Sequence, residues 1–149
     1  MLKLSRLTDY AVAAMVRLGV AGGAETSPSI AASIGVPEPT VAKVLKALAA
    51  RGLISSRRGI NGGYRLDRPL NEISVAEVIV AIDGPIALVS CIDGVGTGCE
   101  NQLCPLVGRW EPVNHAINQA LSGITLATMA ASVASPDCKD VSTKLDEVI

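Results

Sequence analysis

The sequence predicts a mainly α-helical fold with one small β-hairpin, and three observations support this class. Two short helical segments joined by a glycine-containing turn occupy residues 27–52, a pattern typical of a helix-turn-helix. An arginine-bearing hairpin segment, residues 53–66, follows directly. Between Leu106 and Ile124, apolar residues recur at steps of three and four, as on a helix that packs against a partner. Together they predict a winged helix-turn-helix domain that binds DNA, followed by a dimerisation helix.

The first two helices are expected before residue 36. Apolar residues recur at helical spacing from Leu7 onward, and the pair Gly22-Gly23 ends that pattern. The next helix has Ser27 as its expected cap and Pro28 in its first position, where the missing N–H of proline does no harm. It stops at Gly35.

A third helix is predicted between Pro39 and Gly52, with Gly52 as its C′ residue. As the second helix of the motif, it is the one that enters a major groove. The residues expected to contact DNA lie on the two helices of the motif and on the hairpin that follows: Ser29, Pro39, Thr40, Lys43, Lys46, Arg57, Arg58 and Asn61.

The hairpin is predicted because Asn61-Gly62 lies between two β-prone runs. A hairpin behind a helix-turn-helix is a wing. Arg57 and Arg58 near its tip are expected to reach the neighbouring minor groove, where narrow A·T-rich segments attract arginine.

The distribution of charge agrees with a polyanionic partner. Residues 1–70 hold ten Lys or Arg against four Asp or Glu, whereas residues 71–149 hold three against ten.

Phe is absent, so the core must consist of smaller aliphatic residues, which makes burial against a second chain attractive. No secretory signal or membrane span is expected, and the predicted location is cytoplasmic.

After the wing, Ser74 and Glu77 form the pattern of a capping box and start a short helix. Beyond residue 104, Pro112 either kinks a longer helix or lies in the first turn of one that begins near Glu111. A closing helix is expected over Thr125–Ala131. The predicted dimer seam consists of the apolar positions Leu106, Trp110, Val113, Ile117 and Leu121.

Three parts are therefore expected. Residues 1–68 form the winged helix-turn-helix domain. Residues 69–131 contain a linker helix, a cysteine-bearing loop at 91–104 and the dimerisation helix. Residues 132–149 mix Pro, Ser, Asp and Lys and form a flexible tail.

The loop at 91–104 carries Cys91, Cys99 and Cys104 with three glycines in its first gap. The spacing lacks the paired C-x2-C of structural zinc sites and the C-x-x-C of thiol oxidoreductases. Thiolates suit soft metals, and a cysteine before proline recurs in iron–sulfur loops. The alternatives are a cluster, a thiol switch or zinc site, and idle cysteines. A fourth ligand would be Cys138, His115, Asp9, or water or a small thiol.

The chain resembles the Rrf-type winged-helix transcription regulators, the family that contains IscR and NsrR. The likeness covers roughly residues 1–131 and is greatest to the branch that regulates the SUF iron–sulfur assembly operon. Besides the three-cysteine loop, the motifs that carry it are Leu7-Thr-Asp-Tyr10, Pro39-Thr-Val-Ala-Lys-Val-Leu45, Arg57-Arg-Gly-Ile-Asn-Gly-Gly-Tyr-Arg-Leu66, Ile73–Glu77, Gly84-Pro-Ile-Ala-Leu88 and Ile117-Asn-Gln-Ala-Leu-Ser-Gly-Ile-Thr-Leu126.

This resemblance implies a homodimer on a palindromic operator and a cluster held by the three loop cysteines. NsrR-like members add an aspartate from the partner subunit, which carries over to Asp9. IscR-like members use a histidine three residues after the last cysteine, where this chain has Val107. The cysteine spacing differs from the commoner C-x5-C-x5-C, so both [2Fe-2S] and [4Fe-4S] remain open.

The resulting hypothesis is a non-enzymatic cluster sensor that represses SUF-type assembly genes. The alternative is a DNA-binding regulator with a cluster-free thiol, nitrosative or zinc switch. A small redox enzyme is disfavoured, since the sequence shows no cofactor fingerprint and no base–nucleophile pair. The sequence leaves open the operator, the direction of regulation, the signal and the role of Cys138.

Overall fold

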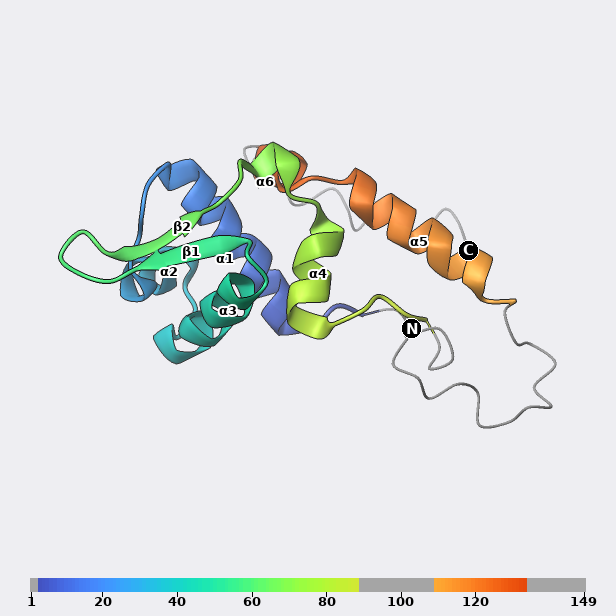
Figure 1. Cartoon of the computed structure of the whole chain (residues 1–149), viewed down its shortest axis with the longest axis horizontal. Helices are drawn as coiled ribbons and strands as arrows, with labels where there is room; N and C mark the ends of the chain where they lie inside the picture. The colour runs from blue at the N-terminus through green and yellow to red at the C-terminus, as the bar shows by residue number, and fades with distance from the viewer. Residues whose placement is uncertain (1–2, 89–108, 134–149) are drawn as a thin grey trace, which may run out of the picture.

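The computed structural model describes residues 3–88 and 109–133. They form a mainly helical structure with one two-stranded antiparallel sheet, in the predicted order (Figure 1). The elements are α1 (Arg6–Ala21), α2 (Ser27–Ile34), α3 (Glu38–Ala50), β1 (Ile54–Arg57), β2 (Gly63–Leu66), η1 (Leu70–Glu72), α4 (Val75–Asp83), α5 (Glu111–Gly123) and α6 (Leu126–Val133). The predicted cysteine loop and tail, with Leu106, Val107 and Cys138, lie outside the described residues.

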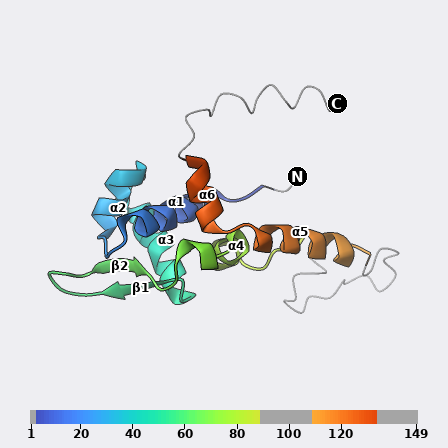
Figure 2. The same ribbon diagram turned by 90° about the horizontal axis from the view of Figure 1, so that it is seen from above.

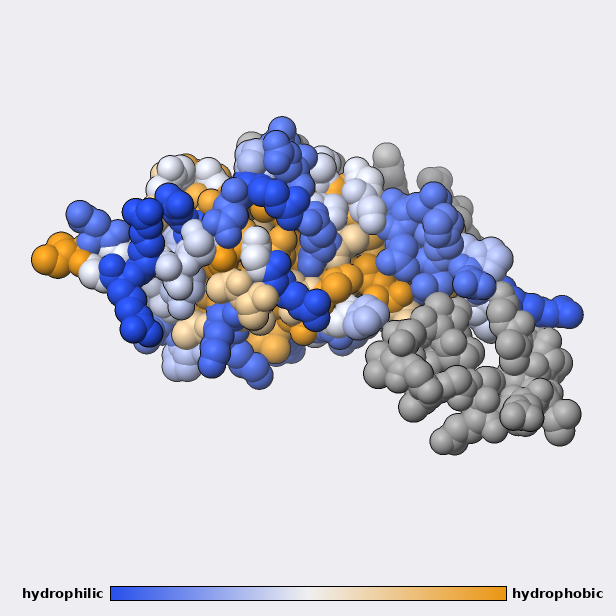
Figure 3. Space-filling view, in the orientation of Figure 1, coloured by the Kyte–Doolittle hydropathy of each residue, from blue (hydrophilic) through white to orange (hydrophobic). Residues whose placement is uncertain are grey.

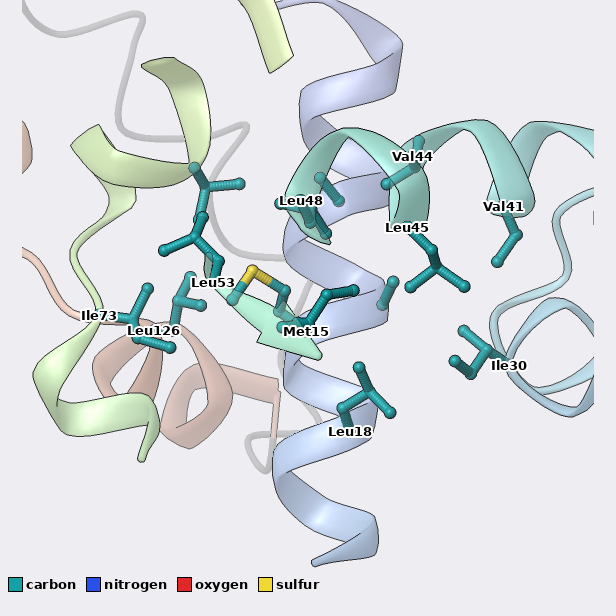
Figure 4. Packing of buried hydrophobic residues seen from close by; sticks show 14 of the residues in the cluster. Met15, Leu18, Ile30, Val41, Val44, Leu45, Leu48, Leu53, Ile73 and Leu126 are labelled. Carbon is teal, nitrogen blue, oxygen red and sulfur yellow. The ribbon is translucent and has the colours of Figure 1, made fainter. Parts of the chain in front are cut away.

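One hydrophobic core joins the helix-turn-helix to the elements that follow it. Aliphatic side chains of α1, α2 and α3 meet Leu53, which precedes β1, as predicted from the absence of Phe. Tyr10 and Tyr64 are partly buried against the same core. Figure 4 shows Met15 of α1 among side chains of α3, with Ile73, which follows η1, and Leu126 of α6 nearby. The later elements thus share the core of α1, α2 and α3, which are called the reader helices below.

The helix boundaries differ from the sequence prediction by one or two residues: α3 begins at Glu38 and not at Pro39, and α6 covers Leu126–Val133 where Thr125–Ala131 was expected. At α2 the cap itself differs. Thr26, and not Ser27, is the N-cap of α2, since its hydroxyl accepts from the Ser29 N–H. Both residue types cap well, and Pro28 fits either of the first two helical positions, so the signal permitted a shift of one residue. The predicted capping box at Ser74 and Glu77 is present at the start of α4.

The alternatives for Pro112 are resolved, because α5 begins at Glu111 with the proline in its first turn. The helix extends away from the reader helices and packs on α4 (Figures 1 and 2). The chain then returns: the Val75 N–H donates to the Ile124 carbonyl and the Leu126 N–H to the Ile73 carbonyl, both at 2.9 Å. This pair of bonds directs α6 back onto α1.

No helix in the described ranges is long and apolar enough to cross a membrane.

Candidate nucleic-acid interface

The predicted recognition helix α3 buries one face and exposes the other. Four aliphatic side chains, Val41, Val44, Leu45 and Leu48, lie in the core. Lys43 and Lys46 are exposed on the opposite face, and Thr40 is half-buried beside them. Ser29 near the start of α2 and Pro39 at the start of α3 are exposed as well. The helical period therefore presents two cations and small side chains on one accessible surface.

The wing is an antiparallel pair in which Arg57 lies opposite Gly63 and Ile54 opposite Leu66. Its tip carries three of the predicted DNA-contacting residues, Arg57, Arg58 and Asn61, all exposed. In the part of the chain that the structure describes, their side chains form no hydrogen bond or ion pair. They are therefore available to an anionic partner.

The base of the wing is fixed by Glu25, in the connection between α1 and α2. Its backbone N–H donates to the Tyr64 carbonyl at 2.9 Å, and the Tyr64 N–H donates back to the Glu25 carbonyl at 2.7 Å. The two backbones approach so closely that a Cβ on Gly63 would lie 2.6 Å from the Glu25 carbonyl oxygen. A glycine is thus required where the second strand starts.

The side chain of Glu25 adds a second tie. Arg17 of α1 donates to both of its carboxylate oxygens, at 2.6 and 3.0 Å, in a bidentate arrangement. The hydrogen bond and the charge of Glu25 raise the pKa of Arg17 further above its already high value. The pair therefore connects the C-terminal part of α1 to the base of the wing.

The candidate ligands of a metal are only partly described. Asp9 is exposed in the first turn of α1, and its carboxylate has no hydrogen bond or ion pair within the described residues. His115 is exposed on α5. Within residues 3–88 and 109–133, no group of three His, Cys, Asp or Glu side chains is placed to hold a metal. The three cysteines predicted as ligands, Cys91, Cys99 and Cys104, lie outside these ranges.

The chain that leads toward the cysteine segment is held at two points. At the end of α4, Asp83 accepts from the Thr8 hydroxyl at 2.7 Å and from the Ser5 N–H at 3.3 Å. Burial raises the pKa of Asp83, but the hydrogen bonds from Ser5 and Thr8 outweigh it and hold the pKa below its ordinary value. The end of α4 is thereby attached to the start of α1.

The second point lies on α5. The Leu88 N–H donates to the Asn114 side-chain oxygen at 3.2 Å, and the Asn118 side-chain amide donates to the Ile86 carbonyl at 3.3 Å. Residues 83–88 therefore run from the reader helix α1 to the predicted dimer helix α5, just before Cys91 in the sequence.

The predicted dimer seam is largely accessible in the single chain. No residue of α5 is buried, and Trp110 and Val113 are 41% and 44% exposed. Ile117 and Leu121 continue the same stripe and are half-buried. A helix with an apolar stripe and no buried residue has a face that remains to be covered.

Several positioning residues were not anticipated from the sequence: Arg17, Glu25, Asp83, Asn114 and Asn118. Only the repeated glycines before Tyr64 gave a hint, since a glycine at the start of a strand often marks a close backbone approach. The sequence does not reveal that Glu25 is the segment which approaches.

Comparisons with known proteins agree with this architecture. Residues 4–132 match the family model Rrf2, described as an iron-dependent transcriptional regulator. The chain is 34% identical over 131 residues to the putative HTH-type transcriptional regulator Rv1287 of Mycobacterium tuberculosis, covering 87% of this chain and 81% of the relative. It is 33% identical over 133 residues to the HTH-type transcriptional regulator IscR of Klebsiella pneumoniae, covering 86% and 79%.

Among solved structures, the chain is similar to CymR of Bacillus subtilis, described as the global cysteine regulator. The TM-score is 0.70 at 26% identity, over 89% of this chain and 98% of CymR.

Proposed function

Because this chain belongs to the Rrf2 family of transcription regulators, a DNA-binding family and not one of enzymes, we propose that it represses SUF-type iron–sulfur assembly genes in response to a bound cluster. The observation that carries the proposal is the placement of residues 83–88. They connect the reader helix α1 with α5 immediately before a segment that holds three cysteines in fourteen residues.

The proposed DNA contact uses α3 and the wing together. Lys43 and Lys46 carry charge toward phosphates, and Arg57 and Arg58 carry charge toward the minor groove and the phosphates that border it. Thr40 and Asn61 have groups that hydrogen-bond to base edges. Ser29 and Pro39 border the start of the same surface. In this proposal two such surfaces, related by a two-fold axis, recognise the two halves of a palindromic operator.

The second copy is proposed to cover the α5 stripe. Trp110, Val113 and Ile117 would meet the same residues of the partner across a two-fold axis, with Leu106 and Leu121 at the ends of the contact. An aromatic residue among aliphatic ones is typical of the core of a dimer interface.

The proposed cluster ligands are Cys91, Cys99 and Cys104, with Asp9 of the partner subunit as the fourth. The donor set fits: three soft thiolates suit iron, and an exposed carboxylate without a described partner accepts a metal without breaking another contact. A bound cluster would supply iron that reacts with oxygen or nitric oxide. The chain's own contribution is to connect that state to α1 and α5 through residues 83–88.

The first experiment measures iron, acid-labile sulfide and the visible absorption spectrum of protein purified without oxygen. We expect near-stoichiometric iron and sulfide that are lost when Cys91, Cys99 or Cys104 is changed to Ala. Operator binding of the loaded and cluster-free forms should then differ. Equal binding by both forms would contradict cluster sensing while leaving the DNA-binding function intact.

A second candidate is a DNA-binding regulator with the same winged helix-turn-helix, in which the cysteines form a thiol switch without a cluster. The structural likeness to CymR, described as a cysteine regulator, favours it. Protein that stays colourless after reconstitution with iron and sulfide, but changes its DNA affinity on oxidation by a disulfide reagent, would support this candidate instead.

A further inference from the structure

One residue at the wing tip is not explained by the proposed phosphate and base contacts. Ile60 has a relative exposure of 105%, the highest of the large hydrophobic residues that the structure describes. Single exposed apolar residues are common and by themselves indicate nothing. The position of this one, at the centre of a turn that directly follows Arg57 and Arg58, is what calls for a reason.

The turn that presents Ile60 is closely defined. The Gly62 N–H donates to the Gly59 carbonyl at 2.9 Å, so Ile60 and Asn61 are its two central residues. A Cβ on Gly62 would lie 2.4 Å from the Arg57 carbonyl oxygen, which leaves no room for a side chain there. Gly, Pro, Asn, Asp and Ser are the usual residues of such turns, and a β-branched residue gains nothing locally.

The surroundings of Ile60 indicate the chemistry of its partner. Arg57 and Arg58 precede it, Asn61 follows it, and residues 57–62 contain no acidic side chain. Figure 3 shows hydrophobic atoms at the free end of the hairpin with hydrophilic residues alongside. An apolar tip flanked by cations fits a surface that is both anionic and partly apolar. The minor groove of DNA has this character, with sugar walls between two rows of phosphates.

We propose that Ile60 is a specificity-determining residue that packs into the minor groove under the wing and disfavours G·C pairs there. A·T pairs place only acceptors on the floor of that groove, whereas guanine adds its N2 amino group. An aliphatic side chain above that amino group removes its water and offers no acceptor in return, which is unfavourable. This inference rests on the proposed DNA-binding mode of the wing.

The first test compares variants on duplex DNA carrying a site selected from a random library. We expect Ile60→Ala to weaken binding of the dimer by at least about 10-fold, because each of two wings loses three carbon atoms from an apolar contact. The dependence of the affinity on salt should not change. Arg58→Ala should instead reduce the slope of log K against log salt by about 2, since two phosphate contacts are lost per dimer.

The control is Val20→Ala, which removes apolar atoms from another highly exposed position (71%), at the end of α1. It should bind as the wild type does. If Ile60→Ala also binds as the wild type does while Arg58→Ala still weakens binding, the inference about Ile60 is wrong and the DNA-binding wing stands. If the wild type shows no salt-dependent binding, both fail together.

The second test isolates the amino group. Library selection with wild-type protein should exclude G·C at the base pairs under the wing, and selection with Ile60→Ser should admit it. Replacing guanine by inosine at those pairs removes the N2 amino group and leaves the major groove unchanged. Wild-type affinity for the inosine duplex should approach that for A·T. An inosine duplex that binds as poorly as the G·C duplex would overturn the proposal.

Discussion

At the scale of single residues, the wing depends on Gly63, a position that has no room for a side chain. Gly63 has a φ of 143° and lies against the Glu25 backbone, so both its conformation and its surroundings exclude a side chain. The exchange of backbone hydrogen bonds between Glu25 and Tyr64 is possible only because of this glycine. The wing is therefore attached to the connection between α1 and α2 through a residue that is not among those predicted to contact DNA.

We predict that Gly63→Ala lowers the free energy of unfolding by about 1–3 kcal/mol, because the new Cβ strains the backbone and separates Tyr64 from Glu25. Urea unfolding followed by circular dichroism measures this change. The matched control is Gly23→Ala, where a Cβ would meet nothing within 4 Å. If both variants were equally stable, the Glu25 contact would not hold the wing.

Residues that act through the periodicity of one element were predictable, whereas those that act across elements were not. Lys43 and Lys46 follow from the helical period, since the core positions of α3 fix which side faces out. Arg17 and Glu25 belong to different elements, and nothing in their local sequence indicates that they pair. Whether a surface carboxylate meets an arginine depends on packing that the sequence does not display.

At the scale of elements, the ends of a helix depend on its capping residues. The proposed function of α5 depends instead on the apolar face that it leaves exposed. The capping box of α4 was predictable because its two residues satisfy backbone groups of their own helix. The start of α5 was not, because proline is compatible with either a kink or a first turn. The structure adds that α5 packs on α4 without burying any residue of its own.

We predict that Val113→Glu raises the dissociation constant of the homodimer about 10- to 100-fold. An unpaired carboxylate would be buried at the centre of the proposed seam, and the monomer should remain folded because Val113 is 44% exposed in the single chain. Sedimentation equilibrium measures the effect. Gln119→Glu places the same charge on the opposite face of α5 and should leave the dimer unchanged.

At the scale of the whole molecule, the core connects parts that were predicted to be separate in function. Ile73, between η1 and α4, and Leu126 of α6 share the core with α1 and α3. The Thr8 hydroxyl, in a residue only 1% exposed, has its partner in Asp83, 75 residues along the chain. A buried hydroxyl needs a hydrogen-bond partner, but the position of Thr8 in the sequence does not identify which residue that is. A change near the cysteine segment thus has a short path to the reader helices.

The contact between Asp83 and the start of α1 gives this path a testable pH dependence. The pKa of Asp83 is lower in the folded chain than its ordinary value. The stabilisation is therefore fully present above the pKa of the unfolded chain, near pH 4, and is lost as the pH falls through the folded pKa. At neutral pH it should amount to about 1 kcal/mol, because partial solvent exposure reduces the value of a hydrogen bond to a charged group.

We therefore predict that Asp83→Asn is less stable than the wild type by a constant amount between pH 5 and 7, and that the difference shrinks below about pH 4. Urea unfolding at each pH measures it. Asp67→Asn removes an exposed carboxylate that has no hydrogen bond in the described part of the chain, and it should follow the wild type throughout. A difference between Asp83→Asn and wild type that persisted undiminished at the lowest pH would mean that the charge of Asp83 does not hold α4 to α1.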